Sequence, residues 1–231
     1  MSNELIRVID LNKTYDNEAC KTEVLHGLSF SVNEGEFVSI MGPSGCGKST
    51  LLYLLGGLEK PTAGQVLFGG RELYALSDKE QSRLRCREIG FVFQFYNLIQ
   101  SLTVEENILL PLSMAGEKTI LYKERLQTLL EKLGLQDKRN ATPNMLSGGQ
   151  QQRVAIARAL IGGAKLILAD EPTGNLDSRS GEAVMALFDE IHRTTDVTVI
   201  LVTHDPGVAA HSDRRIVMSD GVILSDSQKQ Q

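Results

Sequence analysis

The chain has 231 residues, of which 42% are hydrophobic and 23% are charged, a balance typical of globular proteins rather than of disordered ones. Its 29 acidic and 24 basic side chains give a net charge of −5, which argues against a broad nucleic-acid-binding surface because such a surface needs an excess of basic residues. The length favours one α/β domain with a small subdomain, and a polar tail is expected at residues 225–231.

Cysteines and hydropathy limit the compartment and the relation to a membrane. The three cysteines, Cys20, Cys46 and Cys86, are odd in number and widely spaced, so neither a disulfide framework nor a pair of metal ligands is predicted. We find no secretory signal pattern, and no apolar stretch approaches the ~18 residues that a membrane-spanning helix needs. Any role at a membrane is therefore expected to act through a partner protein.

The first third of the chain has the periodicity of strands. Apolar residues at strand-like intervals predict strands at Leu5–Leu11 and Leu28–Val32, and Glu36–Met41 is an apolar strand that runs into a glycine-rich loop. A leucine-rich helix is predicted over Ser49–Leu58, followed by a short strand at Gly64–Gly70.

The middle of the chain has the periodicity of helices. Apolar residues recur at i, i+3, i+4 and i+7 as Leu126, Leu129, Leu130 and Leu133. Gly134 is a plausible C-terminal stop for this helix, and a second helix is predicted over Gln150–Leu160.

The last third alternates between strands and a helix. Strands are predicted at Leu166–Ala169 and Val197–Thr203, with an amphipathic helix around Val184–Ile191 between them and a hairpin over Arg215–Leu224 after them. This alternation predicts an α/β fold with a mostly parallel sheet, an N-terminal antiparallel β region and an inserted α-helical subdomain. We place the core at about 1–94 and 161–224 and the helical subdomain at about 95–160.

A phosphate-binding loop lies between the third predicted strand and the first helix. The motif G-x-x-x-x-G-K-[ST] is matched by Gly42, Pro43, Ser44, Gly45, Cys46, Gly47, Lys48 and Ser49. Glycines let successive backbone N–H groups face one phosphate, and the following helix N-terminus adds its positive dipole end. Lys48 suits the β- and γ-phosphates of a nucleotide, Ser49 suits Mg²⁺, and we group Thr50 with the nucleotide-binding residues.

Two carboxylates end the strand Leu166–Ala169. In a P-loop protein, Asp170 would hold Mg²⁺ and Glu171 would act as general base toward the attacking water. A solvated acidic turn is the alternative for such a pair, and the phosphate loop favours the catalytic interpretation.

A second glycine motif precedes the helix Gln150–Leu160. Ser147 can cap that helix, and Gly148 and Gly149 expose backbone N–H groups at its start, followed by Gln150. Taken alone, these residues indicate no more than an ordinary helix cap.

Taken together, the motifs resemble those of ATP-binding-cassette (ABC) ATPases, in family order from Tyr15 to His204. The stretch from Leu146 to Arg153 is similar to the family's signature motif, and Asp170–Asp177 is similar to its acidic strand end and D-loop. The resemblance implies that Tyr15 stacks on adenine, that Gln94 contacts Mg²⁺ or the attacking water, and that His204 hydrogen-bonds the γ-phosphate. It also implies a dimer, expected to be a homodimer, with each ATP between the phosphate loop of one subunit and Ser147 to Gln150 of the other.

The segment after Gln94 resembles the macrolide-export, lipoprotein-release and bacitracin-resistance branch of the family. Such subunits work with a separate integral membrane permease that has few helices and a large extracytoplasmic domain, docked here near Phe95–Pro111. The resemblance therefore implies a location at the cytoplasmic face of a bacterial inner or plasma membrane, and we expect no nucleic-acid partner. Export, extraction or peptide resistance, a signalling ATPase that activates an envelope protein, and an ATPase without a membrane partner all stay open.

Overall fold

The computed structural model describes residues 3–17 and 20–228, which form two compact units. The first unit comprises Met1–Gln81 and Asp196–Gln231, and the second comprises Ser82–Thr195. No helix in these described ranges is long and apolar enough to span a bilayer.

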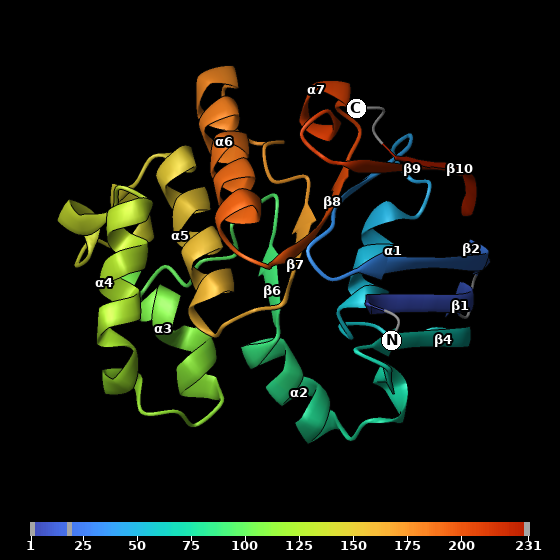
Figure 1. Ribbon diagram of the computed structural model, residues 1–231, viewed down its shortest axis with the longest axis horizontal. Helices are drawn as coiled ribbons and strands as arrows, with labels where there is room; N and C mark the ends of the chain where they lie inside the picture. Colours follow the sequence, from blue (N-terminus) through green and yellow to red (C-terminus); the bar gives the residue numbers. More distant parts are fainter. Residues whose placement is uncertain (1–2, 18–19, 229–231) are drawn as a thin grey trace. The chain divides into compact units, whose positions relative to one another are not determined.

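An antiparallel sheet in the first unit has the strand order β2-β1-β4-β5, and its strands β2, β1 and β4 are labelled in Figure 1. Its strands are β1 (Glu4–Asn17), β2 (Cys20–Asn33), β4 (Ala63–Phe68) and β5 (Arg71–Glu72). This is the antiparallel β region expected near the N-terminus, but β1 continues six residues past the predicted end at Leu11. Register shifts between Val8 and Leu11, and again around Lys13, interrupt the two-residue alternation by which a strand is recognised.

A second group of strands in the first unit runs in the order β10-β9-β3-β8. The central strand β3 (Phe37–Met41) pairs in parallel with both β8 (Thr198–Thr203) and β9 (Arg214–Ser219), and β10 (Val222–Gln228) pairs antiparallel with β9. Every residue of β8 and all but the last of β3 are buried, which explains their nearly continuous apolar sequences.

Short helices complete the first unit. Helix α1 (Lys48–Leu55) follows β3, a 3₁₀ turn (Leu73–Ala75) follows β5, and α7 (Pro206–Ala209) follows β8. The predicted hairpin turns at Asp220-Gly221, both with positive φ, and β10 extends to Gln228 rather than to Leu224. The first four residues of the expected polar tail therefore pair with β9, and residues 229–231 lie outside the described part.

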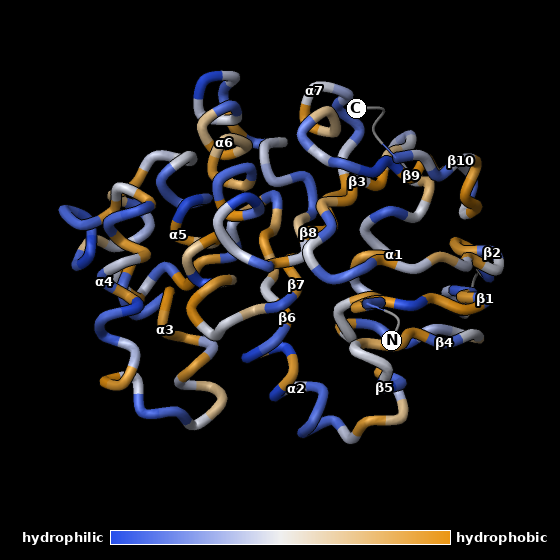
Figure 2. The backbone as a smooth tube through the Cα atoms, in the orientation of Figure 1, coloured by the Kyte–Doolittle hydropathy of each residue, from blue (hydrophilic) through white to orange (hydrophobic). Residues whose placement is uncertain are grey.

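The second unit contains a parallel strand pair and most of the helices. Strands β6 (Ile89–Val92) and β7 (Leu166–Asp170) are parallel, and α6 (Ser178–Thr194) follows β7. Helices α3 (Val104–Met114), α4 (Lys123–Lys132) and α5 (Gly148–Ile161) lie beside one another in Figure 1. Three 3₁₀ turns (Thr119–Tyr122, Gln136–Lys138 and Pro143–Met145) connect them. Figure 2 shows β7 as a hydrophobic stretch, in agreement with its complete burial.

Two helices are not predicted individually from the sequence. Helix α2 (Asp78–Arg87) is almost entirely polar, so it lacks an apolar face that a pattern could reveal. Helix α3 starts at a capping box, in which the Thr103 side chain accepts from the N–H of Glu106 while the Glu106 side chain accepts from that of Thr103. Its last turn contains Pro111, a residue that normally predicts the end of a helix.

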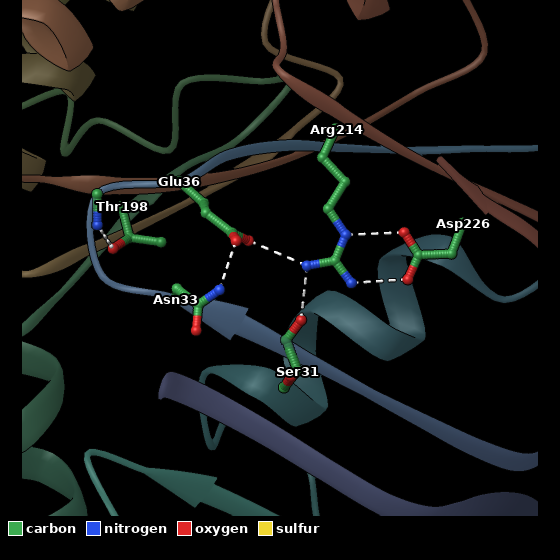
Figure 3. Close-up of polar contacts among 7 residues, drawn as sticks. Ser31, Asn33, Glu36, Thr198, Arg214 and Asp226 are labelled. Atoms are coloured by element: carbon green, nitrogen blue, oxygen red, sulfur yellow. Dashed lines mark hydrogen bonds and ion pairs between the residues drawn. The ribbon is translucent and has the colours of Figure 1, made fainter. Parts of the chain in front are cut away.

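Arg214 on β9 joins three parts of the first unit (Figure 3). Its guanidinium makes a bidentate ion pair with Asp226 on β10, at 2.7 and 2.6 Å, and donates to Glu36 Oε2 at 3.0 Å and to Ser31 O at 2.8 Å. The hydrogen bond with Asp226, together with the charge of Glu36, raises the pKa of Arg214. Because only 13% of the Arg214 side chain is exposed, this cluster is a structural one that ties β2 and the β2–β3 turn to the β9–β10 hairpin.

We expect Arg214→Met to lower the free energy of unfolding by about 2 to 3 kcal/mol, because two carboxylates lose their partner while they stay partly buried. For a chain of this size the melting temperature should fall by roughly 4 to 12 °C, measured by calorimetry or circular dichroism. Arg7→Met is the matched control, since Arg7 is exposed and contacts Glu4 only at 3.8 Å. Equal melting temperatures for the two variants would contradict a stabilising role for the Arg214 cluster.

Candidate functional site

The phosphate loop connects β3 to α1 in the first unit, as its sequence predicts. Gly47 precedes the first residue of α1 with φ +98°, and Gly45 has φ +83°, values at which residues with a Cβ are strained. A Cβ on Gly42 would lie 2.2 Å from Met218 O, and one on Gly47 would lie 2.7 Å from Leu25 Cδ2. Glycine is therefore required at these positions for two reasons: the positive φ of the loop, and the close approach of neighbouring backbone and side chains.

The side chain of Lys48 folds back onto the phosphate loop and is hydrogen-bonded to its backbone. Its ammonium donates to Gly42 O at 2.8 Å and to Pro43 O at 2.9 Å, while only 7% of the residue is exposed. A buried cation whose described partners are uncharged carbonyl oxygens is well placed to bind an anion such as the phosphates of ATP. The residues of this loop thus fit the phosphates of a nucleoside triphosphate.

Cys46 is the small buried residue of the loop. Its sulfur would lie 2.7 Å from a Cβ on Gly42, so it fills the inside of the turn. Cys46 and Cys86 are free thiols, and the side chain of Cys20 lies outside the part that the structure describes.

Tyr15 on β1 is held by a small polar cluster near the phosphate-loop helix. Its hydroxyl donates to Glu59 Oε2 at 2.5 Å and is also hydrogen-bonded to Thr50 on α1. The Lys13 ammonium lies 4.6 Å from the centre of the ring. Burial first, and then the hydrogen bond to Glu59, raise the pKa of Tyr15, so this hydroxyl stays protonated at neutral pH. The structure therefore brings two of the predicted nucleotide-binding residues, Tyr15 and Thr50, into contact.

His204 follows β8 at the same sheet edge as the phosphate loop. In the parallel register, Met41 at the end of β3 is paired with Thr203 at the end of β8. Gly42 and His204 therefore leave the sheet side by side at its carboxyl edge, where α/β proteins bind ligands. The His204 side chain is exposed, and Asp205 after it caps α7.

The second unit repeats this arrangement with β6 and β7. Val92 is paired with Ala169, so Gln94 and the carboxylates Asp170 and Glu171 follow the two strands at one edge. Asp170 is buried, and Glu171 is half-buried with φ +45°. No cluster of three potential metal ligands of the Asp, Glu, His or Cys type occurs within the described ranges.

Gln94 also contacts the segment after Glu171. Its backbone carbonyl accepts from Asn175 Nδ2 at 2.9 Å, and a Cβ on Gly174 would lie 2.8 Å from Gln94 Nε2. Gly174 therefore permits a close approach of two segments that are 80 residues apart in the sequence.

The signature-like motif caps α5. Ser147 Oγ accepts from the N–H of Gln150 at 3.3 Å, and Gln150 Oε1 accepts from the N–H of Ser147 at 2.9 Å. A Cβ on Gly148 would lie 2.7 Å from the Tyr96 hydroxyl oxygen, and one on Gly149 would lie 3.2 Å from Ser180 Cβ. Ser147 itself is exposed, so its hydroxyl is accessible to a ligand.

Arg158 on α5 supports the backbone that follows Gln94, a contact that the sequence does not reveal. Its guanidinium donates to the backbone carbonyls of Tyr96 and Asn97, two residues with φ of +62° and +49°. Burial lowers the pKa of Arg158 to about 10. In the sequence Arg158 is one of the basic residues of a helix, and nothing in the pattern distinguishes a partly buried arginine from an exposed one.

The first unit thus carries Tyr15, residues 42–50 and His204, and the second carries Gln94, residues 147–150 and the carboxylates Asp170 and Glu171. A glycine loop between a buried parallel strand and a helix, with a buried lysine inside it, defines a P-loop nucleotide-binding protein.

Comparison with known proteins gives the family. The model of the ABC transporter family matches residues 25–174. The chain is 44% identical over 227 residues to the lipoprotein-releasing system ATP-binding protein LolD of Shewanella denitrificans, covering 98% of this chain and 97% of that protein. It is 48% identical over 227 residues to the macrolide export ATP-binding/permease protein MacB of Aggregatibacter actinomycetemcomitans, but there it spans 98% of this chain and only 35% of the relative.

A solved structure agrees over the whole chain. The dimeric post-hydrolysis state of the ATP-binding cassette MJ0796, bound to ADP and phosphate, has a TM-score of 0.89 and 41% identity and covers 98% of this chain and 99% of that one. The chain belongs to the ABC transporter family and is an ATP-binding cassette with ATPase activity, which confirms the predicted fold class and family.

We expect Lys48→Ala to weaken nucleotide binding about 10- to 100-fold, because a charge-assisted contact to phosphate is lost. Titration of a fluorescent ATP analogue into the purified protein measures the change. Lys79→Ala, at an exposed lysine of the first unit, is the control. A dissociation constant equal in both variants would remove Lys48 from the nucleotide site.

Proposed function

We propose that the chain dimerises around two ATP molecules and drives a separate membrane permease in export or extraction. The similarity to LolD over almost the full length of both chains supports this proposal most strongly, since LolD is named as the ATP-binding protein of a lipoprotein-releasing system. The match to a cassette solved as a dimer supports the oligomeric state. The permease places the chain at the cytoplasmic face of a bacterial membrane.

In this proposal each ATP lies between the phosphate loop of one subunit and the exposed Ser147 of its partner. The loop N–H groups and Lys48 hold the β- and γ-phosphates, and the Tyr15 ring stacks on adenine. Because the γ-phosphate contacts both subunits, its removal weakens the dimer interface.

Glu171 is the proposed general base. Its carboxylate takes the proton of the water that attacks the γ-phosphorus as the bond to ADP breaks, and His204 hydrogen-bonds a γ-phosphate oxygen. Ser49, Gln94 and Asp170 offer the hydroxyl, amide and carboxylate oxygens that Mg²⁺ prefers, so the donor set fits this ion. When bound, Mg²⁺ neutralises part of the phosphate charge.

The proposed docking surface for the permease lies within Phe95–Pro111. Phe95 is 73% exposed and Ile99 is 43% exposed, so two apolar side chains of this segment are accessible to a partner. A cavity of about 170 Å³ is lined by Asn97 and Pro111 of this segment together with Phe91 and Phe93, and its wall also contains arginine side chains. In this proposal Phe95 and Ile99 offer the apolar contact to a short helix of the permease.

We expect Glu171→Gln to retain ATP binding while its turnover falls about 100-fold or more, the range of a lost general base. With ATP and Mg²⁺ the variant should elute from size exclusion as a dimer, whereas without nucleotide it should elute as a monomer. Glu182→Gln, at an exposed position of α6, is the matched control. Turnover at the wild-type rate in Glu171→Gln would exclude Glu171 as the base.

We expect Phe95→Ser to reduce co-purification of the permease partner about five-fold or more, because loss of an exposed aromatic anchor costs an interface more than about 1 kcal/mol. Leu58→Ser, at another exposed apolar residue, is the control. Equal permease recovery with both variants would contradict docking at Phe95.

A further inference from the structure

Gln152 is a buried polar residue outside the residues assigned so far. It lies in the second turn of α5, none of its surface is exposed, and its side-chain Nε2 donates to Pro172 O at 2.7 Å. A carbonyl oxygen can only accept a hydrogen bond, so the nitrogen of the amide must face Pro172. Pro172 directly follows Glu171, the proposed base.

The backbone around Glu171 needs such an anchor. Glu171 has φ +45°, a left-handed conformation that residues other than glycine seldom adopt without support from their surroundings. Pro172 has no N–H, so its carbonyl is the one backbone group through which this residue can be hydrogen-bonded. The Gln152 amide holds that carbonyl.

A second contact restrains the same loop from another element. Asn175 Nδ2 donates to Gln94 O, and the N–H of Gly174 donates to Glu171 O at 3.0 Å to close the turn. Gln152 is the contribution of α5, and the capping box at Ser147 fixes where that helix begins. The helix that starts with the signature motif is therefore linked to the loop that carries the carboxylate by one buried hydrogen bond.

The oxygen of the same amide, Gln152 Oε1, bears on whether the side chain is present for packing or for its hydrogen bond to Pro172 O. Within the described residues, Gln152 Oε1 is buried and has no hydrogen-bond partner. An apolar side chain of similar length would fill the same space without burying an unsatisfied acceptor. The described hydrogen bond of the amide runs from Nε2 to the loop carbonyl, so the polar side chain contributes to the structure through that bond.

We propose that Gln152 is a positioning residue for ATP hydrolysis, which holds the peptide after Glu171 so that the carboxylate points at the attacking water. This inference rests on the proposed role of Glu171 as base. Gln152 is fully buried and holds the backbone carbonyl of the residue after Glu171, so we expect it to act on the chemical step and not on ATP affinity.

The test is Gln152→Met, which keeps the length of the side chain and removes the donor. The kcat for ATP should fall about 10- to 100-fold, the effect of a small misplacement of a catalytic group, while KM and the affinity for a fluorescent ATP analogue change less than about two-fold. Gln127→Met is the matched control, because Gln127 on α4 makes only an exposed hydrogen bond to Glu131.

Each outcome of the Gln152→Met experiment either supports or overturns the positioning role of Gln152. A wild-type kcat in folded Gln152→Met overturns the positioning role, and so does a rise in KM equal to the fall in kcat. If Gln152→Met shows no cooperative melting transition, Gln152→Glu of the same length replaces it, and failure of both to fold assigns the residue a purely structural role instead. The proposed function is tested separately: it fails if Glu171→Gln turns over at the wild-type rate, whatever Gln152→Met does.

Discussion

The parallel pairing of β3 with β8 and β9 is the constraint on which the first unit depends. Because β3 has a neighbour on both sides and is almost completely buried, its carboxyl end is fixed, and the phosphate loop starts from that fixed point. The same pairing sets His204 beside the loop and puts Met218 O against Gly42, where only glycine fits. The ion pairs of Arg214 hold the β9–β10 hairpin on this framework.

Helix α5 has the corresponding role in the second unit. The helix begins at the signature-like motif, where Ser147 caps it; it holds the loop after Glu171 through Gln152 and supports the turn at Tyr96 and Asn97 through Arg158. The three contacts lie on successive parts of one rigid element. A displacement of α5 would therefore move the signature-like motif, the loop after Glu171 and the proposed docking segment together.

The elements that the sequence predicts well are those whose pattern is local. Strands β3, β7 and β8 are nearly continuous apolar runs between turn residues, and the sequence shows Ser147 as a capping residue before α5. By contrast, α2 has no apolar face, α3 contains Pro111 in its last turn, and the irregular register of β1 hides its second half. In each case packing against other segments decides the structure, and the local pattern does not contain that information.

The sequence by itself determined the motifs: a phosphate loop after a strand, paired carboxylates after another, and a capped glycine motif before a helix. Their chemistry depends on residue type and short spacing, which a sequence displays directly. Only the tertiary structure decided which backbone carbonyls the buried polar side chains bind. Lys48 binds carbonyls of its own loop, whereas Gln152 and Arg158 bind carbonyls that are 20 and about 60 residues away. Such side-chain bonds to distant backbone leave no trace in a sequence, because any residue at the accepting position presents the same carbonyl group.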